Sequence, residues 1–134
     1  MKNNVYLVGV NETNWKDEIA DSLMYFDDTK VFSFHSIFPN YDKTLGIITD
    51  HDTFSLIKRV IKSVNVVFVN YMDILKNPKS IIELTIAYNN NIPILAINES
   101  GENVDPWIHE MCDKEFFARE DAVEFYINYI RKTL

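Results

Sequence analysis

The sequence predicts a single α/β domain, residues 1–134, in which helices cover both faces of a five-stranded parallel sheet. The chain has 134 residues, of which 47% are apolar, and this suits one domain with a substantial core. Short, almost wholly apolar runs alternate with amphipathic stretches, and strands of that kind are typical of a sheet buried on both faces. Five such runs in this length predict a flavodoxin-like three-layer sandwich with strand order 2-1-3-4-5.

In the first half of the chain, each expected element has a local signal. Residues 4–10 form an apolar run ending near a glycine, which predicts a buried strand. Apolar residues then recur at helical spacing from Trp15 to Phe26, and residues 31–34 predict the second strand. Residues 35–49 are expected to form a long loop. The following helix carries an apolar stripe through residue 64, and Asp50 or Asp52 is expected to cap it.

The second half repeats the alternation. Residues 65–70 predict a buried strand, residues 71–79 a loop, and residues 80–89 a helix that is apolar on nearly every side. Residues 92–97 predict the fourth strand, with Pro93 at its start, where a missing N–H does least harm. A polar loop, a short helical turn over residues 106–111, a fifth strand over residues 115–117 and an amphipathic helix over residues 122–130 complete the pattern.

Composition excludes several classes of function. The chain carries 20 acidic and 13 basic side chains, so its net charge of −7 disfavours binding to a nucleic acid polymer. The apolar runs are far shorter than the roughly 18 residues that span a membrane, and residues 1–10 do not resemble a secretory signal. Cys112 is the one cysteine, which suits a reducing compartment, so we expect a cytoplasmic protein.

A sheet of this kind binds ligands beyond the carboxyl ends of its strands, so we expect the site in residues 9–14, 35–50 and 70–80. The first of these loops has a single glycine, Gly9, and matches neither the P-loop nor the dinucleotide fingerprint. NAD or ATP is therefore not indicated. No metal site is expected either: the three histidines are far apart, and helix capping explains the aspartates around His51. Cys112 and His109 lie close enough to pair, but a half-buried structural cysteine is the commoner reading.

Glu83 is the unusual residue, because it is the only charged side chain between Lys79 and Glu99. One interpretation is a capping box in which Ser80 caps the helix and Glu83 reaches back to its amide. The other places Asn77 at the cap and Pro78 at the first helical position, so that Glu83 has no capping duty. Residue pattern alone favours the capping box.

Several motifs, in their order and spacing, resemble nucleoside 2-deoxyribosyltransferases and the related nucleotide N-glycosidases. The resemblance covers roughly residues 4–130, and it rests on Val5–Gly9, Trp15, Val66–Asn70, Ser80-x-x-Glu83-Leu-x-x-Ala87-Tyr88 and Ile92-Pro-Ile. It implies that Glu83 attacks the anomeric carbon of a 2-deoxynucleoside or its monophosphate, and that a second base or water then resolves the ester. No cofactor is implied.

The same resemblance assigns roles to further residues. Tyr6 is expected to orient Glu83, although a strand tyrosine packed in the core is an equal reading of the residue itself. The family's acid should fall near Ile57, which is apolar, so Asp52 or Asp50 would have to substitute, and Asp73 is a further candidate. Asn77-Pro78-Lys79-Ser80 stands where the family often has Asp-x-Gly-Thr. The remaining ligand-binding candidates are Gly9, Asn11, Trp15, Asn70 and Ser80.

Three functions stay open at this point. The leading one is a glycosyl-transferring or glycosyl-hydrolysing enzyme, and the alternatives are a nucleotide-binding relative without turnover and a partner-binding domain. The resemblance implies a homodimer or larger homo-oligomer, since a neighbouring subunit completes the family's site. The chain's aromatic content, 9 Phe, 7 Tyr and 2 Trp, also favours an oligomer, because aromatic residues are enriched at interfaces. We expect the Glu83 carboxylate to face the pocket.

Overall fold

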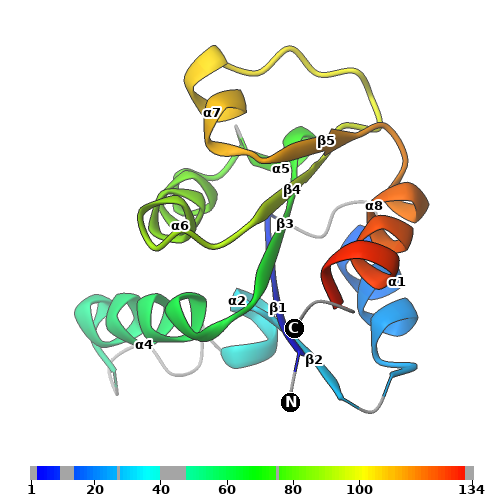
Figure 1. The fold of residues 1–134 in the computed structure, drawn as a ribbon. Coiled ribbons are helices and arrows are strands. Elements are labelled where there is room, and N and C mark those ends of the chain that lie inside the picture. Colours follow the sequence, from blue (N-terminus) through cyan, green and yellow to red (C-terminus); the bar gives the residue numbers. More distant parts are fainter. Residues whose placement is uncertain (1–2, 10–13, 27, 40–47, 75, 132–134) are drawn as a thin grey trace.

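Five parallel strands form one sheet in the order β2-β1-β3-β4-β5, as predicted (Figure 1). The structure is a computed structural model, and it describes residues 3–9, 14–26, 28–39, 48–74 and 76–131. The strands are β1 (Asn3–Val8), β2 (Thr29–Ser33), β3 (Val66–Asn70), β4 (Ile94–Ile97) and β5 (Lys114–Phe116).

Helices lie on both faces of this sheet, which confirms the expected three layers. Figure 1 shows α4 and α6 on one face, and α1 and α8 on the other. The helices are α1 (Trp15–Leu23), α2 (Phe34–Ile37), α4 (Asp50–Ser63), α5 (Tyr71–Ile74), α6 (Pro78–Asn89), α7 (Pro106–Met111), α8 (Arg119–Phe125) and the π-helical segment η1 (Tyr126–Ile130). Among the described residues, no helix is long and apolar enough to cross a membrane.

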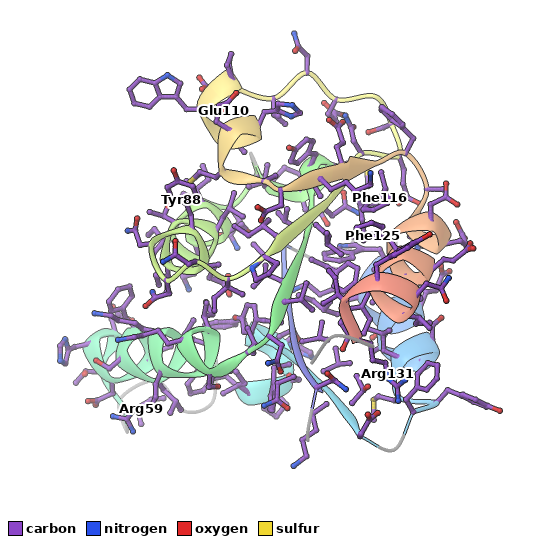
Figure 2. The ribbon with its side chains drawn as sticks, viewed as in Figure 1. Arg59, Tyr88, Glu110, Phe116, Phe125 and Arg131 are labelled. Atoms are coloured by element: carbon purple, nitrogen blue, oxygen red, sulfur yellow. The ribbon has the colours of Figure 1, made fainter. Side chains whose placement is uncertain are left out.

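The alternation of side chains along each strand divides the core into two halves. Tyr6 and Val8 of β1 pack with α4 and α6, whereas Val5 and Leu7 pack with α1 and α8. All five residues of β3 are buried, as expected for the central strand. In the half of the core that contains α1 and α8, the rings of Phe116 of β5 and Phe125 of α8 pack with centroids 5.4 Å apart (Figure 2). Because of this division, Tyr6 points towards the face that carries α6.

The two long loops that the sequence predicted each contain a short helix. A reciprocal pair of hydrogen bonds between Ser33 and Ser36 starts α2 directly after β2, within the stretch expected to be a loop. In the same way α5 follows β3 directly. Strand β4 begins at Ile94, because Pro93 has no N–H to donate, although its carbonyl accepts from the Val67 amide at 2.9 Å.

Candidate active site

Two adjoining cavities open beside the carboxyl ends of β1 and β2, at the edge of the sheet where the sequence predicted a site. The apolar lobe, of about 370 Å³, lies between α4 and α6, and its lining residues are Phe34, Asp50, Thr53, Phe54, Ile57, Lys79, Ile82, Glu83 and Ile86. The polar lobe, of about 360 Å³, is lined by Gly9, Lys16, Asp17, Ser33, Phe34, His35, Asn77, Lys79 and Glu83. Three residues, Phe34, Lys79 and Glu83, line both lobes, so the lobes meet beside them.

The start of α6 determines why Glu83 lies at this junction. The Asn77 side chain caps the helix, accepting from the Lys79 amide at 3.1 Å, and Pro78 takes the first helical position. Ser80 is therefore a buried residue inside the helix, and the predicted capping box of Ser80 and Glu83 is wrong. Because Glu83 has no capping role, this residue, which is 7% exposed, is available to line both lobes.

Tyr6 holds that carboxylate from the floor of the site. The Tyr6 side chain is fully buried in β1, and its hydroxyl donates a hydrogen bond to Oε2 of Glu83. Both readings of Tyr6 therefore apply, since the ring packs in the core while the hydroxyl reaches α6. The two residues are 77 positions apart in the sequence. This contact fixes one carboxylate oxygen and leaves the carboxylate beside both lobes.

The surroundings of Glu83 tune its ionisation. Burial raises the pKa of Glu83 to about 7, while the Tyr6 hydrogen bond and the charges of Lys16 and Lys79 pull it down. Burial, followed by the charge of Glu83, raises the pKa of Tyr6 far above its ordinary value, so the phenol stays protonated and remains a donor. Near neutral pH, Glu83 is thus close to the midpoint between a neutral acid and a nucleophilic carboxylate.

Trp15 and Asp73 are brought together beside Gly9. The indole N–H of Trp15 donates to Oδ2 of Asp73 at 2.8 Å, and both side chains are buried. Gly9 lies against this pair with a φ of +127°, and a Cβ built there would be 3.2 Å from both Asp73 Cβ and Trp15 Cζ2. Asp73 and Trp15 line neither lobe. Both side chains lie against Gly9, at the end of β1.

The structure separates the two substitute acids at the start of α4. Asp52 is exposed, and its carboxylate accepts from the Thr49 amide at 3.0 Å in a capping box, which lowers its pKa. It lines neither lobe, so our assignment of Asp52 as an acid at the site is not supported by its position. Asp50 does line the apolar lobe with Glu83. Ile57, near which the resemblance led us to expect an acid, is buried and lines that same lobe.

The other ligand-binding candidates are distributed unevenly. Gly9 lines the polar lobe, whereas the buried Asn70 lines neither lobe, and its side-chain oxygen accepts from the Met72 amide at 3.0 Å. Asn11 lies outside the described residues. Ser80 is buried and lines neither lobe.

Sequence reasoning missed Lys16. In the sequence it lies among the charged residues between Trp15 and Ile19, which the helical pattern marks as polar. The structure buries it to 8% exposure at the wall of the polar lobe. Burial lowers the pKa of Lys16, against the opposing effects of Glu83, Asp73 and Asp17. No local signal distinguishes such a lysine, since its burial depends on residues of other segments, such as Gly9 and Glu83, that line the same lobe.

The fold has clear counterparts among solved structures, although no protein-family model and no curated protein sequence matches the chain. A 2-deoxyribosyltransferase from Bacillus psychrosaccharolyticus is 17% identical, with a TM-score of 0.70 over 97% of this chain and 94% of that one. A 2-deoxyribosyltransferase from Leishmania mexicana is 12% identical, with a TM-score of 0.65 over 95% and 98%. A CMP N-glycosidase from Clostridium botulinum is 12% identical, with a TM-score of 0.60 over 91% and 96%. The chain therefore has the fold that 2-deoxyribosyltransferases and a CMP N-glycosidase share, as its motifs predicted.

Proposed function

We propose that this protein breaks the N-glycosidic bond of a 2-deoxynucleoside or its monophosphate, and passes the deoxyribosyl group to another base or to water. One observation carries the proposal: the buried Glu83 carboxylate, held by the Tyr6 hydroxyl, lies at the junction of an apolar and a polar cavity. A nucleoside has the same two halves, a flat base and a hydroxylated sugar, joined at the carbon that a nucleophile must reach. The comparisons support this choice, because the neighbours named above are 2-deoxyribosyltransferases and a CMP N-glycosidase.

The apolar lobe suits the base. Its walls come from α2, α4 and α6 and are dominated by apolar side chains, among them Phe34, Phe54 and Ile82. Such surfaces bind the face of a heteroaromatic ring, and the few polar groups at the rim fix its orientation. With the base in this lobe and the sugar in the polar lobe, the anomeric carbon lies beside Glu83.

The proposed reaction is a double displacement. The Glu83 carboxylate attacks the anomeric carbon, the carbon–nitrogen bond breaks, and its electron pair leaves with the base. The departing base takes up a proton, for which we assign Asp50, the carboxyl group in the apolar lobe besides Glu83. A second base, or water, then attacks the same carbon and releases Glu83, so that two inversions give net retention.

Protonation sets the working range of the nucleophile. With a pKa of about 7, Glu83 is a carboxylate above neutral pH and an acid below it. Tyr6 can only donate in this range, so its hydrogen bond favours the ionised form. We therefore expect the rate of base release to decrease as the pH drops below 7, because Glu83 is then protonated.

The direct test incubates the protein with mixed deoxynucleosides, their monophosphates and a free base, and separates the products by liquid chromatography. New nucleosides indicate transfer, and free base alone indicates hydrolysis. Glu83→Gln should abolish both while the fold stays intact by circular dichroism. Glu110→Gln, an exposed glutamate on α7, is the matched control (Figure 2). Base release that persists in Glu83→Gln contradicts the proposal, as does an inert wild-type protein.

The second candidate function is nucleotide binding without turnover. Ile57 favours it, because an apolar side chain lines the lobe where the family's acid is expected. A thermal-shift screen separates the two functions: stabilisation by nucleotides, with no product from the wild-type protein, supports binding alone.

A further inference from the structure

A groove with an apolar floor lies between α1 and α8, on the face of the sheet that carries neither α4 nor α6. The two helices pack side by side there (Figure 1). The groove has a volume of about 270 Å³. Its floor is formed by Ile19 of α1, which is 1% exposed, with Val123 of α8 and Ile127 of η1 half-buried beside it. Pockets for small molecules span about 300–1,000 Å³, so this groove suits the side chains of a partner better than a metabolite.

Arg119, the first residue of α8, ties the two walls of the groove together. Its Nη1 donates to Oε2 of Glu18 on α1 at 2.8 Å. Its Nε and Nη2 donate to the two carboxylate oxygens of Glu99, which follows β4, at 2.8 and 2.7 Å. Of the described residues that line the groove, Arg119 alone is basic, and its one positive charge is shared between two carboxylates. The groove is therefore preformed, and Arg119 does not offset its other acids.

The rim of the groove is acidic. Glu18, Glu120 and Glu124 line it, and all three residues are exposed. Asp21 and Asp121, on the same two helices, are exposed as well. This local negative charge adds to the chain's net charge of −7. The groove therefore repels nucleic acids and anionic lipid surfaces, and it attracts a partner that carries positive charge.

One wall of the groove has an unusual backbone. Ile127 and Asn128 line the groove within η1, where a π-helical segment follows the α-helix that ends at Phe125. π-Helical turns are rare, and they occur frequently at functional sites. This segment places Ile127 on the same floor as Val123. The π-helical turn is thus a second feature, independent of charge, that sets this groove apart from an ordinary contact between two helices.

We propose that the groove between α1 and α8 is a docking site for a partner protein that presents a basic amphipathic helix. Apolar side chains on one face of that helix pack on Ile19, Val123 and Ile127, and its lysine or arginine side chains pair with the glutamates of the rim. An extended peptide is disfavoured, because the groove lies between helices and offers no strand edge. The site is independent of the proposed glycosidic function, since Glu83 belongs to α6 on the other face of the sheet.

The test uses a synthetic partner of this chemistry. The probe is a fluorescein-labelled peptide of leucine and lysine, about 18 residues long, with leucine at the spacing of one helical face. Fluorescence anisotropy measures its Kd beside two control peptides, one with the same residues in scrambled order and one with glutamate in place of lysine. We expect the amphipathic basic peptide to bind at least about tenfold more tightly than either control.

Matched variants separate the charge of the rim from the apolar floor. Glu124→Lys should weaken binding at least about fivefold, and Glu110→Lys, the same change on an exposed residue of α7, should leave it unaltered. Val123→Thr keeps the shape of the side chain but places a hydroxyl in the floor, so it should weaken binding at least about threefold. Val104→Thr, at another half-buried valine, is its control. Circular dichroism checks that each variant is folded.

Methyl resonances in NMR spectra locate the bound peptide. Shifts at Ile19, Val123 and Ile127 support the docking site, whereas shifts confined to Ile82 of the apolar lobe overturn it. Equal binding of the scrambled peptide also overturns it, because charge alone then explains the attraction, and so does the absence of binding. Turnover of deoxynucleosides by Glu124→Lys should equal that of the wild-type protein. Failure of the docking site therefore leaves the proposed function standing, and an inert wild-type protein leaves the docking site standing.

Discussion

Replacing Glu83 with glutamine should stabilise the protein above neutral pH, even though it removes the proposed nucleophile. Glu83 is 7% exposed, and its ionised form is taken out of water with only partial compensation from Tyr6 and two lysines. Glutamine keeps the volume and can still accept the Tyr6 hydrogen bond through its amide oxygen. It never ionises, so it avoids this cost.

The magnitude follows from the pKa of Glu83. The folded protein raises it from an ordinary value of 4.5 to about 7, which corresponds to about 3 kcal/mol at about 1.4 kcal/mol per pKa unit. Between these two values the folded state binds more protons than the unfolded state, so the wild-type protein loses stability as pH rises. Below 4.5 Glu83 is neutral in both states, and the loss is absent.

Urea unfolding followed by circular dichroism measures the difference directly. The free energy of unfolding of Glu83→Gln, relative to the wild-type protein, should increase by about 3 kcal/mol between pH 4 and pH 8. Glu110→Gln serves as the control for the change in net charge. A relative stability that is independent of pH, or one that turns in favour of the wild-type protein as pH rises, would refute the reasoning about Glu83.

Three further predictions concern the same region. Tyr6→Phe removes the hydrogen bond to the Glu83 carboxylate, and a hydrogen bond to a charged group is worth about 1.5–3 kcal/mol. The pKa of Glu83 should therefore rise, and the acid limb of the pH–rate profile should move up by about 1–2 pH units. A limb that does not move would contradict a role for this contact. Gly9→Ala should lower the free energy of unfolding by about 1–3 kcal/mol, because its φ is +127° and the added Cβ would lie 3.2 Å from Asp73 and Trp15. Gly101→Ala should lower it less in the same thermal unfolding experiment, because its φ is +68° and the space around it is open. Light scattering should show a homodimer or larger assembly at micromolar concentration, and a monomer would contradict this prediction. Phe54 and Ile82, 45% and 48% exposed beside the apolar lobe, are surfaces that such an assembly would cover.

The layered fold could be predicted from the sequence because its signals are local. The run over Val66–Asn70 is apolar on both faces, which only a central strand between two helical layers can bury, and the structure buries all five residues. Strand–helix alternation then limits the possible topologies to a few, since crossovers between parallel strands are right-handed. The position of the candidate site followed from the same topology, because loops at the carboxyl ends of such strands share one edge.

The register of α6 was beyond what local pattern could decide. Asn77 with Pro78, and Ser80 with Glu83, each satisfy the rules for a helix start, and residue pattern favoured the wrong pair. The tertiary structure decides between them through burial, because the longer helix brings Glu83 over β1 and the Tyr6 hydroxyl. A capping box would have turned the same carboxylate back onto its own helix.

Tertiary structure alone also decided which charged groups belong to the site. Asp50 and Asp52 are two residues apart, yet helical rotation places Asp50 at the apolar lobe and leaves Asp52 at the cap. The polar position of Lys16 in the helical pattern is typical of a surface lysine, but the structure buries it at the wall of the polar lobe. Sequence periodicity reports which side of an element is apolar. The cost of burying a charge depends on groups that other segments bring to it, and those become neighbours only when the chain folds.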